Sequence, residues 1–134
     1  PEAAERLAAR GWLDGSDVER IARLWHFGQL IGNTDMHDGN LSFQPIELNG
    51  EAALKVSPAY DMLPMLYAPV RGVELPARHF EPRLPLPAER ERWGPSARAA
   101  TVFWQTAAAD ERISAGFRSM CAANAQMLQR LMPL

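Results

Sequence analysis

The dipeptide Asn49-Gly50 restricts the fold of this chain more than any other feature. It separates two strand-like runs, 41–48 and 51–56, and Asn-Gly is the pair most favoured in a two-residue type I′ turn. Such a turn sets the register of an antiparallel hairpin. It pairs Pro45 with Leu54 at a non-hydrogen-bonded position, where the missing N–H of proline costs little.

The same register brings two polar segments to the open end of the hairpin. It places Asn40 opposite Ala59, so that Asp61 lies just beyond the last pair. The first polar segment, 33–40, reads Asn-Thr-Asp-Met-His-Asp-Gly-Asn and contains Asp35. We therefore expect Asp35, Asn40 and Asp61 to share one site.

The three residue types and their order are those that kinases use for phosphoryl transfer: a catalytic aspartate, an asparagine five residues later, and a second aspartate after a hairpin. Asp35 fits the catalytic base that accepts the proton of an acceptor hydroxyl. Asn40 and Asp61 offer the hard oxygen ligands that Mg²⁺ prefers, so we predict Mg²⁺ and ATP as cofactors. His37 either donates toward the transferred phosphate or braces the loop.

Three other interpretations fit the sequence of this loop less well. An EF-hand that starts at Asn33 would have its glycine one position late and Gln44 in place of the final glutamate. A zinc site is disfavoured because His26 and His79 are not spaced as partners of His37. A structural turn rich in Asn and Asp explains the loop alone, but not the Tyr60-Asp61 element beyond the hairpin.

Most of the remaining chain has helical periodicity. Residues 2–10 favour helix and end at Gly11. A capping box of Ser16 and Glu19 opens a second helix that is predicted to reach Ile31 and to end at Gly32. Two further helices are predicted, one over residues 96–108 and one that is capped by Asp110. The second of these has a stripe at helical spacing, made of Ile113, Phe117, Met120, Asn124, Met127 and Leu131. The predicted fold class is mainly α with one small β-hairpin.

Between the hairpin and these last helices lies a Pro-rich segment, residues 64–95. It holds seven of the eleven prolines, which excludes a long helix or a central strand. We expect an irregular surface segment within a single domain of residues 1–134. The side chains expected to anchor it are Leu66, Tyr67, Phe80, Leu84 and Leu86.

The composition excludes several functional classes. The net charge is −2, and the thirteen arginines and the single lysine, Lys55, are interspersed with acidic residues, so direct nucleic-acid binding is not expected. No apolar run reaches the length of a membrane span. Cys121, the only cysteine, is predicted to be a buried thiol in a reducing cytoplasm.

Two segments of the sequence resemble a known family. They read Leu30-Ile31-Gly32-Asn33-Thr34-Asp35-Met36-His37-Asp38-Gly39-Asn40 and Ser57-Pro58-Ala59-Tyr60-Asp61-Met62-Leu63-Pro64. This pattern resembles the C-terminal signature of HipA-like serine/threonine kinases, the toxins of bacterial toxin–antitoxin pairs. The resemblance implies a protein-kinase-like fold of which this chain is the helical C-terminal lobe. It also implies that Asp35 is catalytic and that Asn40 and Asp61 bind Mg²⁺.

The resemblance further implies partners. Members of this family phosphorylate protein substrates, including aminoacyl-tRNA synthetases, and are restrained by a small helix-turn-helix antitoxin. The chain starts at Pro1-Glu2, which we interpret as a fragment of a longer protein whose N-terminal lobe would carry the glycine-rich loop and the ATP-binding lysine. Lys55 lies in the wrong place to substitute for that lysine, so the fragment alone is expected to be inactive.

The chain departs from the HipA-like pattern at Gly39, where the family often has a basic residue. Residues 35–40 are also similar to the Asp-Leu-His-x-Gly-Asn loop of aminoglycoside and choline phosphotransferases, although Asn33-Thr34 replaces their usual His-Gly. A small-molecule phosphotransferase is therefore the alternative enzyme. A pseudokinase that serves as an interaction module is the non-enzymatic alternative.

Overall fold

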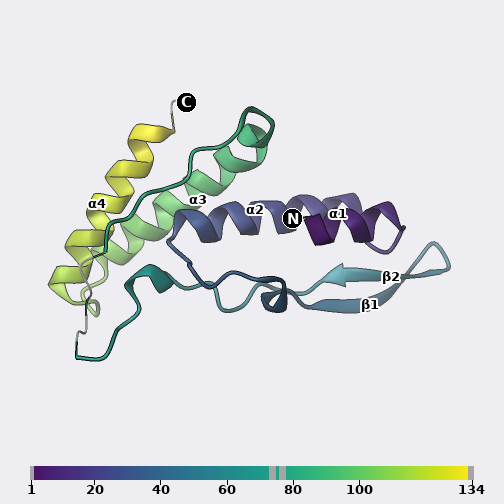
Figure 1. Ribbon diagram of the computed structural model, residues 1–134, viewed down its shortest axis with the longest axis horizontal. Coiled ribbons are helices and arrows are strands. Elements are labelled where there is room, and N and C mark those ends of the chain that lie inside the picture. The colour runs from purple at the N-terminus through teal and green to yellow at the C-terminus, as the bar shows by residue number, and fades with distance from the viewer. Residues whose placement is uncertain (1, 73–74, 76–77, 133–134) are drawn as a thin grey trace.

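The computed structural model describes residues 2–72, 75 and 78–132. It is mainly helical with one antiparallel hairpin, as the sequence predicts (Figure 1). The elements in chain order are α1 (Glu2–Ala9), α2 (Gly15–Leu30), η1 (Asp38–Asn40), β1 (Phe43–Leu48), β2 (Glu51–Val56), η2 (Met65–Tyr67), η3 (Pro87–Glu89), α3 (Arg90–Ala109) and α4 (Ala115–Leu131).

The hairpin has the predicted register. Pro45 pairs with Leu54, and Leu48 pairs with Glu51 next to the turn. Both turn residues have positive φ, 54° at Asn49 and 84° at Gly50, as a type I′ turn requires. The first strand begins at Phe43 rather than at Leu41, although Ser57 N still donates to Ser42 O at 2.8 Å just beyond the ladder.

The outer edge of β2 is bound to the helices. At the non-hydrogen-bonded positions of the hairpin, the N–H groups of β2 point away from β1. Leu54 N donates to Trp12 O at 2.8 Å, and Val56 N donates to Asp17 Oδ2 at 2.9 Å. Asp17 is buried, so its carboxylate binds the hairpin to the first turn of α2 within the protein interior. Figure 1 shows the hairpin lying along α2.

The predicted capping box of α2 is wrong. The N-cap is Asp14, whose Oδ1 accepts from Ser16 N at 2.7 Å, and the helix starts at Gly15. Ser16 is therefore already inside the helix. Glu19 does not reach back to a cap either, because its carboxylate pairs with Arg92 of α3 at 2.6 Å.

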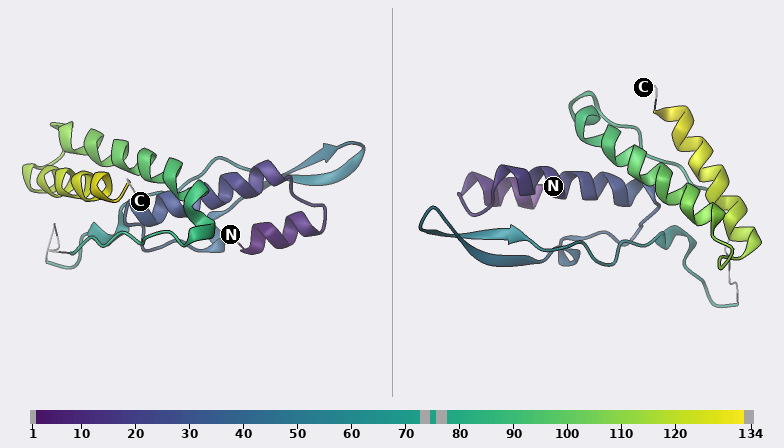
Figure 2. Two further views of the ribbon diagram at one scale, coloured as in Figure 1. Left: turned by 90° about the horizontal axis from the view of Figure 1, so that it is seen from above. Right: turned by 180° about the vertical axis from the view of Figure 1, so that it is seen from behind.

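Two separate apolar clusters form the interior. The large cluster joins the end of α2, the Pro-rich segment, α3 and α4, and its most deeply buried large side chain is that of Trp104. The small cluster joins α1, the first half of α2 and the hairpin. Figures 1 and 2 show the α3–α4 pair at one end of α2, and α1 with the hairpin along the other part. Helix α2 is the element that contributes to both clusters.

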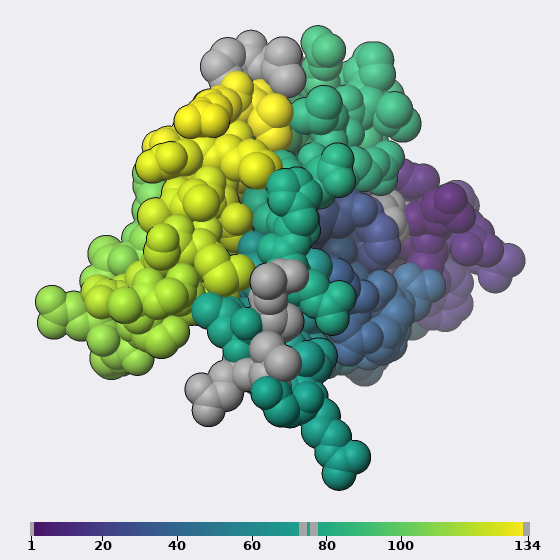
Figure 3. All heavy atoms as spheres, turned by 60° about the vertical axis from the view of Figure 1, so that its left-hand side comes forward, coloured from purple at the N-terminus to yellow at the C-terminus, as the bar shows by residue number. Residues whose placement is uncertain are grey.

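The Pro-rich segment crosses the surface between α4 and the first part of the chain (Figure 3). Tyr67 and Phe80 anchor it in the large cluster, with exposures of 6% and 4%, and Asn124 Nδ2 of α4 donates to Tyr67 Oη at 2.9 Å. Leu66 packs against the same cluster. The prediction for Leu84 and Leu86 is wrong, because they are 49% and 58% exposed. Nothing in their hydropathy distinguishes them from the true anchors.

The last two helices differ in their boundaries from the prediction. Helix α3 begins at Arg90, six residues early, and contains Pro95. The added residues of the helix are stabilised because Trp93 is buried and its Nε1 donates to Arg83 O at 3.2 Å. These interactions offset the loss of the backbone hydrogen bond that Pro95 cannot donate. Asp110 ends α3 instead of capping α4; that cap is Ser114, whose Oγ accepts from Phe117 N.

The buried face of α4 contains most of the predicted stripe, since Phe117, Met120, Met127 and Leu131 pack against the large cluster, but its most buried residues are others. Asn124 is buried as expected, while the deepest apolar side chains are Cys121 and Leu128, both at 0% exposure, and Ile113 lies outside the helix. Cys121 lies in the large cluster, which confirms the predicted buried thiol, and this burial raises the pKa of the thiol. Within the described residues no helix is long and apolar enough to cross a membrane.

Helices α1 and α2 end in the same way. In each, a glycine with left-handed φ follows the last turn: Gly11 at 77° and Gly32 at 71°. The following N–H groups bond back in the Schellman pattern, Trp12 N to Leu7 O at 3.0 Å and Asn33 N to Gly28 O at 2.9 Å. The two glycines differ in their surroundings, since only a Cβ at Gly32 would meet other side chains, with Leu66 Cβ at 3.3 Å.

We predict that Gly32→Ala destabilises the fold more than Gly11→Ala. Both variants require alanine in a left-handed conformation, which costs about 1–2 kcal/mol. Gly32→Ala adds the steric contact with Leu66 and is expected to cost roughly a further 1 kcal/mol. Urea denaturation followed by circular dichroism measures both free energies of unfolding. Equal losses would show that the packing around Gly32 adjusts freely.

Candidate functional site

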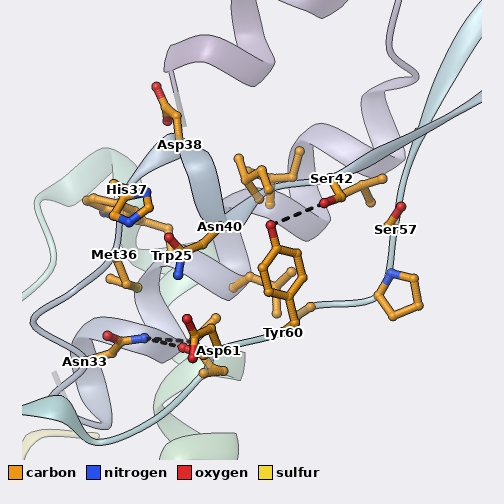
Figure 4. A pocket seen from close by; sticks show the side chains of 17 residues that line it. Trp25, Asn33, Met36, His37, Asp38, Asn40, Ser42, Ser57, Tyr60 and Asp61 are labelled. Carbon is orange, nitrogen blue, oxygen red and sulfur yellow. Dashed lines mark hydrogen bonds between the residues drawn. The ribbon is translucent and has the colours of Figure 1, made fainter.

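The predicted site residues lie at the junction of the two apolar clusters. The loop from Asn33 to Leu41 leaves the end of α2, and residues 57–62 return from the hairpin beside it. Together they line a pocket under α2 (Figure 4). Its walls are mainly apolar, with Ile21, Leu24, Trp25, Met36, Val56 and Met62 among them. The polar groups of Asn40 and Asp61 face this apolar interior.

Asn40 carries an unusual acceptor. The short helix η1 ends at this residue, and Asn40 N donates to His37 O at 3.0 Å. Its Oδ1 atom is buried and has no hydrogen-bond partner in the described part of the chain. A buried carbonyl oxygen without a partner is unfavourable by about 1–3 kcal/mol. A cation or a donor group that enters the pocket would remove that cost.

Asp61 adopts a strained backbone conformation beside Asn40. Its φ is +57°, and the only other non-glycine residue with a left-handed φ among those described is Asn49 in the hairpin turn. The Asp61 side chain is exposed, and both Asp61 and Asn40 line the pocket. Figure 4 shows the Asp61 carboxylate directed toward Asn40. Backbone strain of this kind persists only where neighbouring groups hold it, and it concentrates at functional sites.

Asn33 connects the two halves of the site. Its Oδ1 accepts from Asp35 N at 3.0 Å, and its Nδ2 donates to Asp61 O at 3.2 Å. The side chain is buried, at 6% exposure. From the sequence, Asn33 was interpreted only as part of a polar turn. The spacing Asn33-x-Asp35 does indicate the local turn, but the contact across the site depends on the tertiary fold.

Asp35 and His37 differ in their relation to the pocket: His37 lines it, whereas Asp35 does not. The Asp35 side chain is exposed, so its carboxylate is open to solvent rather than enclosed with the Asn40 amide. The ring of His37 lies against Gly39, where an added Cβ would come within 2.8 Å of Nδ1. A basic residue at position 39, as in the pattern that this loop resembles, would therefore fit only if the His37 ring moved.

Tyr60, which the sequence marks only as the neighbour of Asp61, is a second functional candidate. Its hydroxyl donates to Gly39 O at 2.8 Å and accepts from Ser42 Oγ at 3.2 Å. At the open end of the hairpin, Tyr60 thus connects the segment that precedes Asp61 to Gly39, the residue before Asn40. Its position directly before Asp61 was the available signal.

The oxygen donors fit a magnesium ion better than a transition metal. Within the described residues no group of three or more His, Cys, Asp and Glu side chains could hold a metal. Mg²⁺ is usually held by one or two protein oxygens together with water and phosphate oxygens. The unpartnered Asn40 oxygen and the Asp61 carboxylate, which line one pocket, would serve as such a pair of oxygen donors.

Gly28 allows both segments of the site to pack against α2. A Cβ at this position would lie within 2.0 Å of Met36 Sδ and 3.1 Å of Met62 Sδ. Met36 belongs to the loop of Asp35, and Met62 follows Asp61. One missing side chain in the last turns of α2 therefore makes room for both methionines.

We predict that Gly28→Ala displaces both segments, although alanine is the better helix former. The matched control is Gly15→Ala in the first turn of the same helix, where nothing lies within 4 Å of an added Cβ. The control should stabilise the fold by up to about 1 kcal/mol. Gly28→Ala should instead destabilise it by roughly 1–3 kcal/mol, because the site overpacks. Thermal unfolding of the two variants measures this; stabilisation by both would contradict the packing role of Gly28.

Comparison with known proteins shows the family of the chain. The family described as HipA-like C-terminal domain matches residues 2–129. Toxin YjjJ from Escherichia coli (strain K12) is 39% identical over 118 residues, which cover 88% of this chain and 26% of that protein. The chain thus spans about a quarter of the length of this curated relative. No solved structure gives a significant match. Because the family match extends over almost the whole sequence, the chain belongs to the HipA-like C-terminal domain family.

Proposed function

We propose that this chain forms the catalytic lobe of an ATP-dependent serine/threonine protein kinase of the HipA toxin type. The observation that carries the proposal is the convergence of Asn40 and Asp61 on one pocket. The buried Asn40 Oδ1 lacks a partner, and the Asp61 backbone is strained. Both features lower the stability of the fold. They suit a site that is completed when Mg²⁺ and a nucleotide bind.

The two sides of the loop have different roles in this proposal. Asn40 and Asp61, inside the pocket, hold the metal through their oxygen atoms. Asp35, on the exposed side, accepts a hydrogen bond from the hydroxyl of the acceptor protein and takes up its proton. A protein substrate is too large for the pocket under α2, so an outward-facing carboxylate suits it. When bound, Mg²⁺-ATP supplies the phosphoryl group and neutralises its charge.

His37 is placed for a supporting role. Its ring lies over Gly39, between the exposed Asp35 and the inward-facing Asn40 along the loop. We infer that it fixes the turn that separates the two sides. Donation from His37 toward the phosphate requires the ring to leave Gly39.

The partners follow from the family and not from the site alone. Toxin YjjJ is named a toxin, and we propose the same role for the protein that carries this chain. Its substrate would be the hydroxyl of a cytoplasmic protein, with an aminoacyl-tRNA synthetase as one candidate class. An N-terminal lobe would supply the remaining nucleotide contacts, and a small helix-turn-helix antitoxin would restrain the activity.

The first test is transfer of labelled γ-phosphate from Mg²⁺-ATP by the natural gene product that carries this sequence. With cell lysate as acceptor, Asp35→Ala should lower labelling at least about a hundredfold, the usual contribution of a general base. Asp38→Ala is the matched control, because its carboxylate lies in the same loop and points away from Asn40 and Asp61 (Figure 4). The control should retain most of the activity.

The acceptors decide between the enzyme classes. Labelling of an aminoglycoside or choline instead of protein would favour a small-molecule phosphotransferase. No labelling by the wild-type protein would contradict the proposed kinase and favour an interaction module.

The metal assignment has its own test. Asp61→Ala removes a ligand, so calorimetric titration with Mg²⁺-ATP should show an affinity loss of about tenfold or more, equivalent to at least 1.4 kcal/mol. Asp35→Ala should leave this affinity nearly unchanged, since its carboxylate does not line the pocket. Unchanged affinity in the Asp61 variant would show that the metal is held elsewhere.

A further inference from the structure

We infer that Asn33 is a positioning residue that couples the catalytic loop to the metal-binding aspartate. This inference rests on the proposed kinase function. Asn33 lies outside the triplet Asp35, Asn40 and Asp61, yet its side chain is bonded to the backbone of two of these three residues. It contacts the site without supplying any reacting atom.

The orientation of the Asn33 amide is fixed by its partners. On one side is the Asp35 N–H, which needs an acceptor at 3.0 Å; on the other is the Asp61 carbonyl, which needs a donor at 3.2 Å. A flipped amide would place two donors together and two acceptors together. Nδ2 also lies 3.7 Å from Met62 Sδ. Asparagine makes both contacts because it carries an acceptor and a donor on one short planar group.

The position of this amide is set by helix α2. Asn33 N donates to Gly28 O as the last bond of the Schellman motif, so the backbone of Asn33 is part of the helix end. The side chain starts from this fixed point and is 6% exposed. It therefore has little freedom to follow the two loops if they move; instead, it restricts them.

The strained residue is the one that Asn33 holds. Asp61 has a φ of +57°, which is unfavourable for a residue with a Cβ. The hydrogen bond from Asn33 Nδ2 to Asp61 O acts directly on this peptide. Without it, Asp61 is free to relax toward ordinary φ values, and its carboxylate would turn from its position beside Asn40.

Substitution of Asn33 should therefore change how the activity depends on Mg²⁺ concentration, although Asn33 does not bind the metal. If Asp61 relaxes, the Mg²⁺ site loses its pre-organisation. The net contribution of one hydrogen bond, about 1 kcal/mol, corresponds to a roughly fivefold increase in the Mg²⁺ concentration for half-maximal activity. A residue that only stabilises the fold would lower the amount of active protein equally at all Mg²⁺ concentrations.

The experiment compares Asn33→Ser, Asn33→Ala and Asn124→Ala in the natural gene product. Serine keeps an acceptor for the Asp35 N–H but is too short to reach Asp61 O, so Asn33→Ser isolates the second contact. Asn124 is the matched control, because it is equally buried at 5% and makes one long-range bond, to Tyr67 Oη, in the large apolar cluster. Phosphate transfer is measured against Mg²⁺ concentration, and hydrogen exchange is followed in residues 34–40 and 58–64.

Both Asn33 variants should raise the Mg²⁺ half-saturation about fivefold, and both should accelerate exchange in residues 58–64. Only Asn33→Ala should also accelerate exchange in residues 34–40. Asn124→Ala should lower thermal stability without a shift in half-saturation. If Asn33→Ser labels protein with the wild-type Mg²⁺ dependence, the coupling is wrong and the kinase proposal stands. If the wild-type protein transfers no phosphate, both proposals fail together.

Discussion

The end of helix α2 is the constraint on which the rest of the structure depends. Two carbonyl groups of its last turn and that of Gly32, just beyond it, accept from three different parts of the chain: Gly28 O from Asn33 N, Leu30 O from Trp104 Nε1 of α3, and Gly32 O from Leu66 N of the Pro-rich segment. The carbonyls at a helix C-terminus lack partners within the helix. Here they organise the loop, the helical pair and the irregular segment around one point, with glycine required at position 32 by its left-handed φ.

This arrangement explains why the site lies between two apolar clusters. The loop begins at the large cluster and ends at Leu41, which packs on the small one, and Met62 returns to the large cluster after the hairpin. Each segment of the site is thus anchored at both ends while its middle is exposed. The packed ends of each segment hold its backbone in place, and the exposed residues between these ends leave room for a ligand. Tyr60 and Asn33 supply the cross-links between the two segments.

The predictions from sequence succeeded where local chemistry decides the structure. Asn49-Gly50 selects one turn, and that turn fixes the register of the whole hairpin. Glycines 11 and 32 end two helices because only glycine adopts left-handed φ at low cost. The predictions failed where several local solutions were available. Asp14 and Ser16 both suit a helix cap, as do Asp110 and Ser114, and packing of Trp93 extended α3 through Pro95. The exposed Leu84 and Leu86 have the hydropathy of the buried anchors, so sequence could not separate them.

The sequence by itself therefore determined the helical class, the hairpin register and the order of the polar residues, since each depends on neighbours within a few positions. Asn40 and Asp61 were expected together because the turn geometry carries them to one end of the ribbon. Only the tertiary structure decided that Asn33 bonds to Asp61, that Gly28 admits Met36 and Met62, and that Asp35 faces outward. These contacts join residues that are close only after α2, the hairpin and the large cluster have packed, and no local preference encodes them.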